Sequence, residues 1–432
     1  MIYLLVACLY ILRITVKYRK IGKKIIITKS ANIRAGGSLN THDGVNQTGV
    51  RAHNGKLILT LLRRHGSLPK SEIARRSGLT PQTVSVIMRS LEKDGLLLRG
   101  SPQRGKVGQP SIPMSLNPKG AFSIGLKVGR RSAELVLVDF LGQKLQKLSL
   151  TYNYPLPVNL LNFTRNGIET LTNELSPSQK LRIAGIGVAT PFELWNWAEK
   201  IDAPEAEMKH WRDFNFYTEL SALVDYPVFV QNDATAACGA ELIFGRGSEL
   251  SDFVYLFIGT FIGGGVVLNH SVYSGRTGNA GAFGPMPVLN HNNTTATLID
   301  FASIFTLETR LKEINLALPT VGSPAGEWLA LGEPLESWID EASTHLANAI
   351  VASCALIDFE AAVIDGAFPD KIREMVVSSI RIKITNMDTR GINSPKILEG
   401  SVGEDARALG AASQSLLSKF LLNQSVLFKP VS

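Results

Sequence analysis

Cysteine is scarce in this sequence. Three cysteines, Cys8, Cys238 and Cys354, are spread over 432 residues. Their number and spacing exclude a disulfide framework and a clustered zinc site. Few and widely spaced cysteines are typical of proteins in a reducing compartment, so we expect a cytoplasmic protein.

Long apolar runs are also few. Residues 1–12 form an apolar run that ends at Arg13, and this run is shorter than the roughly 20 residues that a membrane helix needs. Basic residues follow this run rather than precede it, and no cleavage site of small residues is evident after it. Both features argue against a signal peptide. We expect no membrane partner, with a membrane anchor as the alternative.

Acidic residues are rare near the N-terminus. Residues 51–110 contain twelve Lys and Arg against three Asp and Glu, and residues 1–50 contain eight against one. The whole chain has a formal net charge of +8, so the remaining residues are net acidic. This distribution is typical of a polyanion-binding module joined to a body that does not bind polyanions. We interpret residues 1–50 as a disordered basic leader or an over-extended reading frame, because no methionine stands between Met1 and Met88.

The stretch from Leu68 to Gly108 predicts a helix-turn-helix followed by a wing. A short helix, Ser71–Ser77, ends at Gly78, where a tight turn favours a residue without a Cβ atom. Thr80 stands at the N-cap of a second helix from Pro81 to about Lys93, and proline is favourable at the first helical position. The spacing predicts a buried stripe made of Val84, Ile87, Met88 and Leu91.

The other face of this second helix is polar and basic, which favours contacts with double-stranded DNA. Short polar side chains at the start of such a helix can reach base edges in the major groove. A strand at Leu96–Arg99 leads to a basic hairpin tip at 101–110, as in a wing. A helical hairpin with a solvated basic face is the alternative. The predicted DNA-binding residues are Thr80, Gln82, Thr83, Ser85, Arg89, Arg104, Lys106 and Gln109.

The segments on either side complete this module. Lys56–His65 predicts a first helix that packs on the other two through Leu57, Leu61 and Leu62. Residues 111–120 contain two prolines and predict a linker. We therefore expect a winged helix-turn-helix domain at 51–117.

From Phe122 onward, buried strands alternate with helices, which predicts an α/β fold with a mixed sheet. An antiparallel meander with a turn at Leu141-Gly142 comes first, and further buried strands are expected at 182–190 and 361–367.

Two candidate sites stand out in this body. Asn232 and Asp233 follow a predicted strand and begin an Ala-rich helix, a position that suits a general base or a hydroxyl acceptor but also a simple helix cap. Gly263 and Gly264 belong to a glycine-rich stretch between two strands, where backbone N–H groups can approach an anion. An ordinary hairpin turn is the alternative for the glycines.

Taken together, NDATAA, LFIGTFIGGGVVLNHSVYSG and GNAGAFGPMPV resemble the ROK family (repressors, open reading frames and sugar kinases). With the winged helix in front, residues 51–420 resemble the ROK transcriptional regulators. The resemblance implies a two-lobed body at 118–432, actin-like or hexokinase-like (ribonuclease H-like), with a sugar cleft. Lobe 1 is expected at about 118–230 plus the C-terminal helix, and lobe 2 at about 231–404.

The sequence departs from the kinases of this family at the residues that carry their chemistry. Lys127 stands where the resemblance places an Asp for Mg²⁺–ATP, and Arg130 and Arg131 replace small residues. Ala282 and Pro285 replace the sugar-binding Glu and His. The family's structural zinc cluster has no counterpart in 289–300, where His291 stands without cysteines. Asp300 is near the expected place of another sugar-contacting acid.

These departures predict that the body has lost kinase activity. Asp233 matches the family's catalytic base, but phosphoryl transfer depends on a phosphate cradle that is missing here. We therefore expect no catalytic residue, no metal and no cofactor. A hydroxyl-binding role fits the residues better, and the predicted ligand-binding residues are Asn232, Asp233, Gly263 and Gly264.

Three tryptophans lie in the loop 191–213, namely Trp195, Trp197 and Trp211. Their rings can stack on a sugar or simply pack the lobes together, and both interpretations stay open.

We interpret the chain as a transcriptional regulator, a repressor of carbohydrate-related genes, that binds a palindromic operator as a homodimer and a sugar or sugar derivative in its cleft. A ROK sugar kinase and a ligand-independent DNA-binding dimer are the alternatives.

Overall fold

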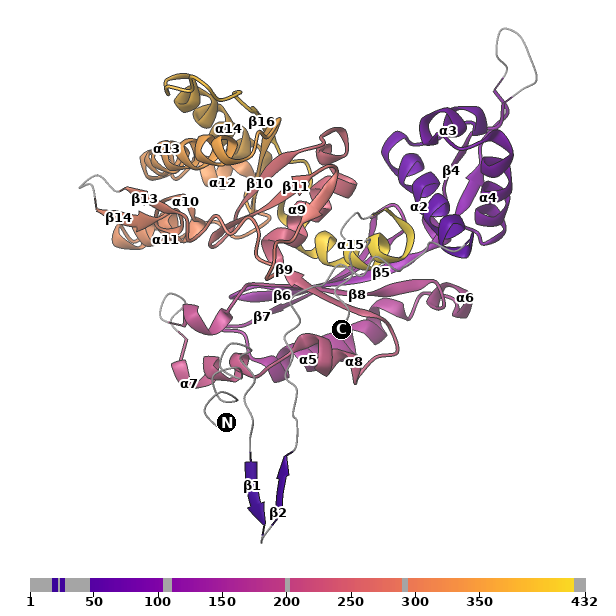
Figure 1. Cartoon of the computed structure of the whole chain (residues 1–432). Coiled ribbons are helices and arrows are strands. Elements are labelled where there is room, and N and C mark those ends of the chain that lie inside the picture. The colour runs from indigo at the N-terminus through magenta and orange to yellow at the C-terminus, as the bar shows by residue number, and fades with distance from the viewer. Residues whose placement is uncertain are drawn as a thin grey trace, which may run out of the picture. The chain divides into compact units, whose positions relative to one another are not determined.

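The computed structural model describes residues 18–21, 24–27, 47–103, 111–198, 203–289 and 294–422 (Figure 1). The chain separates into two compact units, one of residues 1–46 with 430–432 and one of residues 47–429. In the first unit, β1 (Tyr18–Ile21) and β2 (Lys24–Ile27) form an antiparallel hairpin. Strands therefore occur in a segment for which the sequence predicted none. The rest of the predicted leader up to residue 46 lies outside the described residues.

Three helices and a two-stranded hairpin begin the second unit. Helices α2 (Gln47–His65), α3 (Lys70–Ser77) and α4 (Pro81–Lys93) are followed by β3 (Leu97–Arg99), which pairs antiparallel with β4 (Met114–Leu116). This confirms the predicted order of three helices and a wing. The core of the module contains Ile58, Leu59, Leu62, Ile73, Val84, Ile87, Met88, Leu97, Met114 and Leu116.

Several details of the predicted module were wrong. Helix α2 begins at Gln47 rather than Lys56, and its buried face contains Ile58 and Leu59 instead of Leu57 and Leu61, which stay partly exposed. Leu91 is also only partly buried.

The predicted linker at 111–120 contains β4. Met114 and Leu116 alternate with Ser115, as expected for a strand with one buried face, and the two prolines flank the strand instead of breaking it.

Lobe 1 is built on a five-stranded sheet in the order β7-β6-β5-β8-β9. Strands β5 (Phe122–Val128), β6 (Ser132–Asp139) and β7 (Lys144–Thr151) form the predicted meander, while β8 (Ile183–Thr190) and β9 (Val228–Asn232) run parallel to β5. Helix α5 packs on β6 and β7. The helices of this lobe are α5 (Pro157–Thr172), α6 (Pro177–Lys180), α7 (Glu205–Met208) and α8 (Phe216–Ser221).

Lobe 2 repeats this arrangement in the order β12-β11-β10-β15-β16. Strands β10 (Phe253–Ile258), β11 (Ile262–Leu268) and β12 (Ser271–Tyr273) are antiparallel, and β15 (Ala361–Gly366) and β16 (Lys396–Glu399) run parallel to β10. A small hairpin, β13 (Pro287–Leu289) with β14 (Thr295–Thr297), stands apart. The helices of this lobe are α9 (Asp233–Phe244), α10 (Ile299–Ala302), α11 (Ile304–Glu313), α12 (Ala325–Leu329), α13 (Glu333–Leu356) and α14 (Asp370–Thr385).

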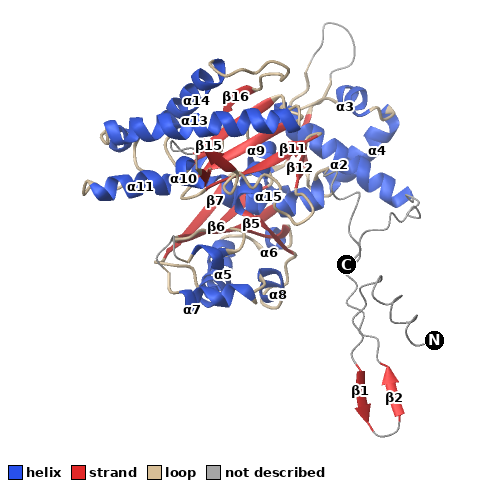
Figure 2. Ribbon diagram, turned by 60° about the vertical axis from the view of Figure 1, so that its left-hand side comes forward, coloured by secondary structure: helices blue, strands red, loops and turns tan. Residues whose placement is uncertain are grey.

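The two sheets, whose strands are red in Figure 2, therefore share one topology, a three-stranded meander followed by two parallel strands. As a consequence, the β5–β6 turn (129–131) and the β10–β11 turn (259–261) hold equivalent positions in the two lobes. Short 3₁₀ turns complete the body at Pro118–Gly120, Leu194–Trp197, Lys209–Arg212, Arg246–Glu249 and Gly403–Asp405.

The last helix, α15 (Ala406–Phe420), packs between the lobe 1 sheet and α9. The approach is close because glycines line it. A Cβ atom on Gly187 would lie 1.7 Å from the carbonyl oxygen of Ala411, and one on Gly410 would lie 1.9 Å from that of Ala236. Such distances leave no room for a side chain, so the position of α15 relative to both lobes is tightly set.

Within the described residues, none of the helices combines the length and the apolar character needed to cross a membrane.

Candidate functional site

Helix α4 is held in place as the sequence predicted. Thr80 caps it, accepting a hydrogen bond from the backbone N–H of Thr83 at 3.2 Å, and Pro81 occupies the first turn. Gly78 has φ +69°, in the left-handed region that favours glycine. Val84, Ile87 and Met88 bury one face of the helix, so the opposite face points outward.

The outward face of α4 carries the predicted base-contacting residues. Gln82 and Arg89 are exposed, and Thr83 and Ser85 are half-buried. Arg89 donates from Nε to the carbonyl oxygen of Ser85 at 3.1 Å, which directs its side chain back along the helix. Sequence reasoning missed Val86, whose side chain is 43% exposed on this face.

A groove beside the N-terminal half of α4 also escaped prediction. Val50, Arg51 and Asn54, from the first turns of α2, line it together with Gln82 and Thr83 of α4. These α2 residues were missed because residues up to 50 were assigned to a leader and the helix was started at Lys56. The groove brings one more cation, Arg51, to the predicted DNA-binding face.

The tip of the wing lies outside the described residues, and with it Arg104, Lys106 and Gln109. At its base, the backbone groups of Gln103 and Ser111 form an isolated β-bridge. Arg99 on β3 is paired with Glu92 at 2.5 Å.

The cleft between the lobes contains a cavity of about 310 Å³, which we call the cleft cavity. Asn232 and Asp233 both line it, but they differ in role. The Asn232 side chain caps α9, since its Oδ1 accepts hydrogen bonds from the backbone N–H groups of Ala234 and Thr235 at 3.0 and 3.1 Å. The Oδ2 atom of Asp233 lies 3.6 Å from Nη1 of Arg407. The cap and the cavity-facing acid are thus neighbouring residues: the structure confirms the helix cap at Asn232, and the hydroxyl-binding role of Asp233 stays a prediction.

Gly263 and Gly264 also line the cleft cavity, but they lie in β11 rather than in a turn. They pair with Phe257 and Leu256 of β10. A Cβ atom on Gly263 would lie 2.7 Å from that of Ala234, and one on Gly264 would lie 2.4 Å from the carbonyl oxygen of Tyr255. These glycines therefore let β11 approach its neighbours closely.

The β5–β6 turn sends its two arginines in different directions. Arg130 lines the cleft cavity, and its guanidinium carbon lies 4.0 Å from the centre of the Phe261 ring in the equivalent turn of lobe 2. Arg131 forms an ion pair of 2.8 Å with Glu308 on α11. Both arginines thus link the two lobes.

Positive charge is concentrated around this turn. Burial, together with the nearby Arg407, lowers the pKa of Arg130 to about 10, and the negative charge of Asp233 opposes the shift. Lys127 is buried, and its Nζ lies 3.2 Å from Glu134. Burial and Arg407 lower the pKa of Lys127 to about 8, against the opposing effect of Glu134.

The two positions that differ from the family's sugar-binding motif, Ala282 and Pro285, line the same cavity. Asp300 caps the turn before α10 instead, because its Oδ2 accepts hydrogen bonds from the backbone N–H and Oγ1 of Thr297 at 3.0 and 2.7 Å.

The tryptophans divide between packing and a cavity wall. Trp211 is buried, donates from Nε1 to the carbonyl oxygen of Pro155 at 3.0 Å, and packs against Phe214 and Phe216. Trp195 lines a second cavity. The side chain of Trp197 is outside the described residues.

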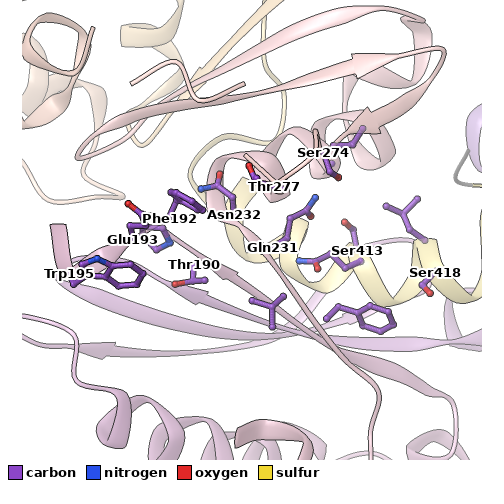
Figure 3. Close-up of a pocket in the computed structure, with 18 residues that line it drawn as sticks. Thr190, Phe192, Glu193, Trp195, Gln231, Asn232, Ser274, Thr277, Ser413 and Ser418 are labelled. Carbon is purple, nitrogen blue, oxygen red and sulfur yellow. The ribbon is translucent and has the colours of Figure 1, made fainter. Parts of the chain in front are cut away.

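This second cavity, of about 650 Å³, adjoins the first and is called here the α15 cavity. Figure 3 shows Ser413 and Ser418 of α15 on one side of it and Glu193 and Trp195 on another. Phe192, Glu193 and Asn232 line both cavities, so the two cavities lie next to each other along the same loop and strand end.

A winged helix-turn-helix joined to a two-lobed body of this topology defines a DNA-binding transcriptional regulator. Comparison with known proteins agrees. Residues 52–97 match the model for winged helix-turn-helix DNA-binding domains, and residues 123–297 match the ROK family model.

Curated relatives extend over most of the chain. The xylose repressor of Bacillus subtilis is 23% identical over 397 residues, which cover 86% of this chain and 97% of that protein. The DNA-binding transcriptional dual regulator NagC of Escherichia coli is 25% identical over 243 residues, or 55% of this chain and 58% of NagC.

Solved structures share the fold. A ROK family transcriptional regulator, described as a homologue of the E. coli MLC protein, aligns with a TM-score of 0.59 at 20% identity, over 86% of this chain and 97% of that one. A ROK family glucokinase from Streptomyces griseus aligns with a TM-score of 0.51 at 19% identity, over 68% of this chain and 99% of the kinase. The chain therefore carries a ROK family domain behind a winged helix-turn-helix DNA-binding domain.

Proposed function

We propose that this protein is a repressor that binds a palindromic operator as a homodimer and releases it when a small polyhydroxylated molecule occupies the cleft cavity. We place it in the cytoplasm and its target genes in carbohydrate metabolism. The name of the xylose repressor supports a role in the transcription of such genes, and the name of NagC supports a role in transcription.

DNA recognition is assigned to the outward face of α4. The exposed Gln82 can hydrogen-bond a base edge, and Thr80, Thr83 and Ser85 lie along the same face. Val86 provides an apolar contact of the kind that thymine methyl groups receive. Arg89, Arg104, Lys106 and Gln109 are assigned to the flanking backbone and the wing.

The contacts of helix α15 are the observation that supports the regulatory part of the proposal. Near its start, Arg407 lines the cleft cavity, and further along, Gln414 and Ser418 line the α15 cavity. At its end, the carbonyl oxygen of Ser418 accepts a hydrogen bond from Nζ of Lys56 on α2 at 2.7 Å. The backbone N–H of Leu422, just after α15, donates to Oγ1 of Thr60 at 2.9 Å. One tightly packed helix thus contacts the ligand cleft at one end and the DNA-binding module at the other.

Kinase activity is not part of the proposal. A kinase needs a compact turn that wraps phosphate groups and a carboxylate that positions the metal. Here the β5–β6 turn places Arg130 in the cleft, and Lys127 is buried beside Glu134. Asp233, the residue matching the family's base, faces Arg407.

The experiment that tests the proposal selects operators from randomised duplexes with the full-length chain and measures affinity by fluorescence anisotropy over a salt titration. We expect a palindromic consensus bound by a dimer. Weak binding that depends only on salt would contradict the proposal. A broad panel of sugars then tests whether ligand binding releases the protein from its operator. If no compound changes the operator affinity or the melting temperature, the protein is a ligand-independent DNA-binding dimer.

A coupled ADP-release assay across hexoses tests the kinase alternative. We expect no turnover above the background without sugar. Sugar-dependent ADP release that Asp233→Asn abolishes would favour the kinase.

A further inference from the structure

Strand β9 forms one edge of the lobe 1 sheet. It pairs with β8 on one side, and none of the described strands pairs with it on the other. The backbone N–H of Ile186 on β8 donates to the carbonyl oxygen of Pro227 at 2.8 Å. Because backbone groups alternate in direction along a strand, Phe229 and Gln231 also face β8, whereas Val230 directs its N–H and C=O to the open side.

This edge lacks the features that usually protect an edge strand. Val230 is 42% exposed, and β9, Val228–Asn232, contains neither a charged residue nor a proline, and its pairing with β8 has no register shift. The opposite edge of the same sheet differs, because β7 carries Lys144 and Lys147 and its pairing with β6 has a register shift. Charges and bulges prevent an edge strand from pairing with another chain. Only β7 has them, so β9 is the edge open to a further strand.

A cavity lies on the α15 face of this edge. A Cβ atom on Gly185 would lie 3.1 Å from side-chain atoms of both Phe229 and Ser415 of α15, so the Phe229 ring is on this face. Side chains two positions apart share a face, and Phe229 and Gln231 both line the α15 cavity. Figure 3 shows Gln231 and Ser413 on neighbouring sides of it.

A second pocket lies on the other face, which α8 covers (Figure 1). We call this pocket, of about 350 Å³, the aromatic pocket. Val230 and Trp195 line both the aromatic pocket and the α15 cavity, so the two flank the same stretch of β9. The aromatic side chains of the aromatic pocket are Trp195, Trp211, Phe214, Phe216 and Tyr217.

The charge of the two linings favours a basic occupant. Glu193 lines both the aromatic pocket and the α15 cavity, and among the described residues no lysine, arginine or histidine lines either. Its φ of 48° is uncommon for a residue with a Cβ atom, and its Oε2 accepts a hydrogen bond from Nδ2 of Asn196 at 2.6 Å. The faces of the aromatic rings also attract cations.

We propose that β9 accepts an extended segment of a partner protein as an additional strand. The main chain of the segment pairs with the N–H and C=O of Val230. Its side chains alternate between the two faces, so that an aromatic or large apolar side chain enters the aromatic pocket and a neighbouring basic or polar side chain lies beside Glu193 in the α15 cavity. In strand addition of this kind, main-chain hydrogen bonds supply affinity and the pockets for alternate side chains supply specificity.

The test begins with short peptides selected from a displayed random library against the full-length protein, and fluorescence anisotropy then measures the affinity of the selected peptide. We expect a consensus in which an aromatic residue is followed by a basic or polar one. N-methylation of each peptide position in turn reports the backbone pairing. We expect methylation to weaken binding about tenfold at every second position and to have little effect between them, because a strand turns alternate N–H groups toward its neighbour.

Variants of β9 test the same pairing from the protein side. Val230→Pro removes the outward N–H but no hydrogen bond to β8, and edge strands tolerate proline at such positions. It is expected to weaken peptide binding about tenfold, whereas Val230→Thr, which keeps the N–H, is expected to stay within about threefold. Melting temperatures establish that both variants fold, and the methylated peptides decide the question if Val230→Pro does not.

Glu193→Gln tests the charge preference. It is expected to abolish the difference in affinity between the selected peptide and one with its basic residue changed to glutamate. Glu205→Gln, at an exposed residue of α7 that lines neither pocket, is expected to keep this difference.

Two results would overturn the inference. One is that no selected peptide binds more tightly than its scrambled sequence. The other is a bound peptide whose affinity changes neither in Val230→Pro nor in the alternating pattern on N-methylation, because such a peptide does not pair with β9.

Discussion

Lys56 on α2 donates a hydrogen bond from Nζ to the backbone carbonyl oxygen of Ser418, 2.7 Å away and near the end of α15. This contact joins the DNA-binding module directly to the helix whose first turn lies in the cleft. A ligand can change operator affinity only if it binds two arrangements of the protein unequally. The contact between α2 and α15 is where such a difference would reach the recognition helix.

Lys56→Ala combined with Thr60→Val should therefore uncouple the two sites. Operator affinity without ligand is expected to stay within about threefold of the wild type, while the ligand-dependent change in affinity, usually worth about 1–3 kcal/mol in coupled systems, becomes smaller. Anisotropy titrations with and without ligand measure both. Lys371→Ala, which removes an exposed lysine of α14 in lobe 2, serves as the control and should leave the coupling intact. An unchanged response in the double variant would mean that the signal takes another route.

Gln82→Ala should relax base preference at one operator position. Gln82 is exposed on the outward face of α4, and a good base contact contributes about 1–3 kcal/mol of discrimination. Competition binding with single-base operator variants measures this loss. Gln143→Ala, an exposed glutamine in the β6–β7 turn, is the matched control. If Gln82→Ala keeps both affinity and sequence preference, the assignment of the recognition face is incorrect.

Lys127 should make stability depend on pH in the alkaline range. Its pKa is lowered from 10.5 to about 8 in the folded protein by burial and by Arg407. Between pH 8 and 10.5 the unfolded chain therefore binds a proton at Lys127 that the folded chain does not, so the free energy of unfolding rises with pH in this window.

The rise attributable to Lys127 is on the order of 2–3 kcal/mol at most. Urea unfolding from pH 7.5 to 10.5, compared with Lys127→Met, isolates it from other titrating groups. The structure indicates that Lys127 is desolvated. Parallel pH profiles for the wild type and Lys127→Met would contradict this.

Gly410→Ala should destabilise the packing of α15. Its Cβ atom would lie 1.9 Å from the carbonyl oxygen of Ala236, and overpacking of this kind costs about 1–3 kcal/mol or more. Gly326→Ala in α12 is the control, because nothing lies within 4 Å of a Cβ atom there, and helix propensity predicts a gain of up to about 1 kcal/mol. Chemical denaturation compares the two. Equal stability of both variants would mean that α15 can shift to accommodate the methyl group.

Local sequence determined the elements of the DNA-binding module that depend on neighbouring residues. Thr80, Pro81 and Gly78 specify a cap, a first turn and a left-handed turn residue through interactions within a few positions, and the structure has all three. The motif around Asn232 likewise predicted a strand end followed by a helix. Such features can be read from sequence because their physical causes are short-range.

The start of α2 and the strand β4 could not be predicted in this way. Gln47–Val50 have no apolar periodicity, and their helix extends one that is packed from Ile58 onward. Residues 114–116 form a strand because they pair with the edge of β3. Met114 and Leu116 then bury their side chains in the core of the module. Both depend on partners elsewhere in the fold.

The sequence alone determined the class of this protein, since the winged-helix spacing and the glycine- and aspartate-containing motifs are contiguous and locally encoded. Only the tertiary structure decided which side chains line the cleft cavity and which elements the helix beside it contacts. Arg130 and Arg407 are 277 positions apart in the printed sequence, and they line one cavity because two equivalent lobes and a shared helix converge there. The contact from Ser418 to Lys56 arises for the same reason: long-range packing brings together side chains that no local pattern relates.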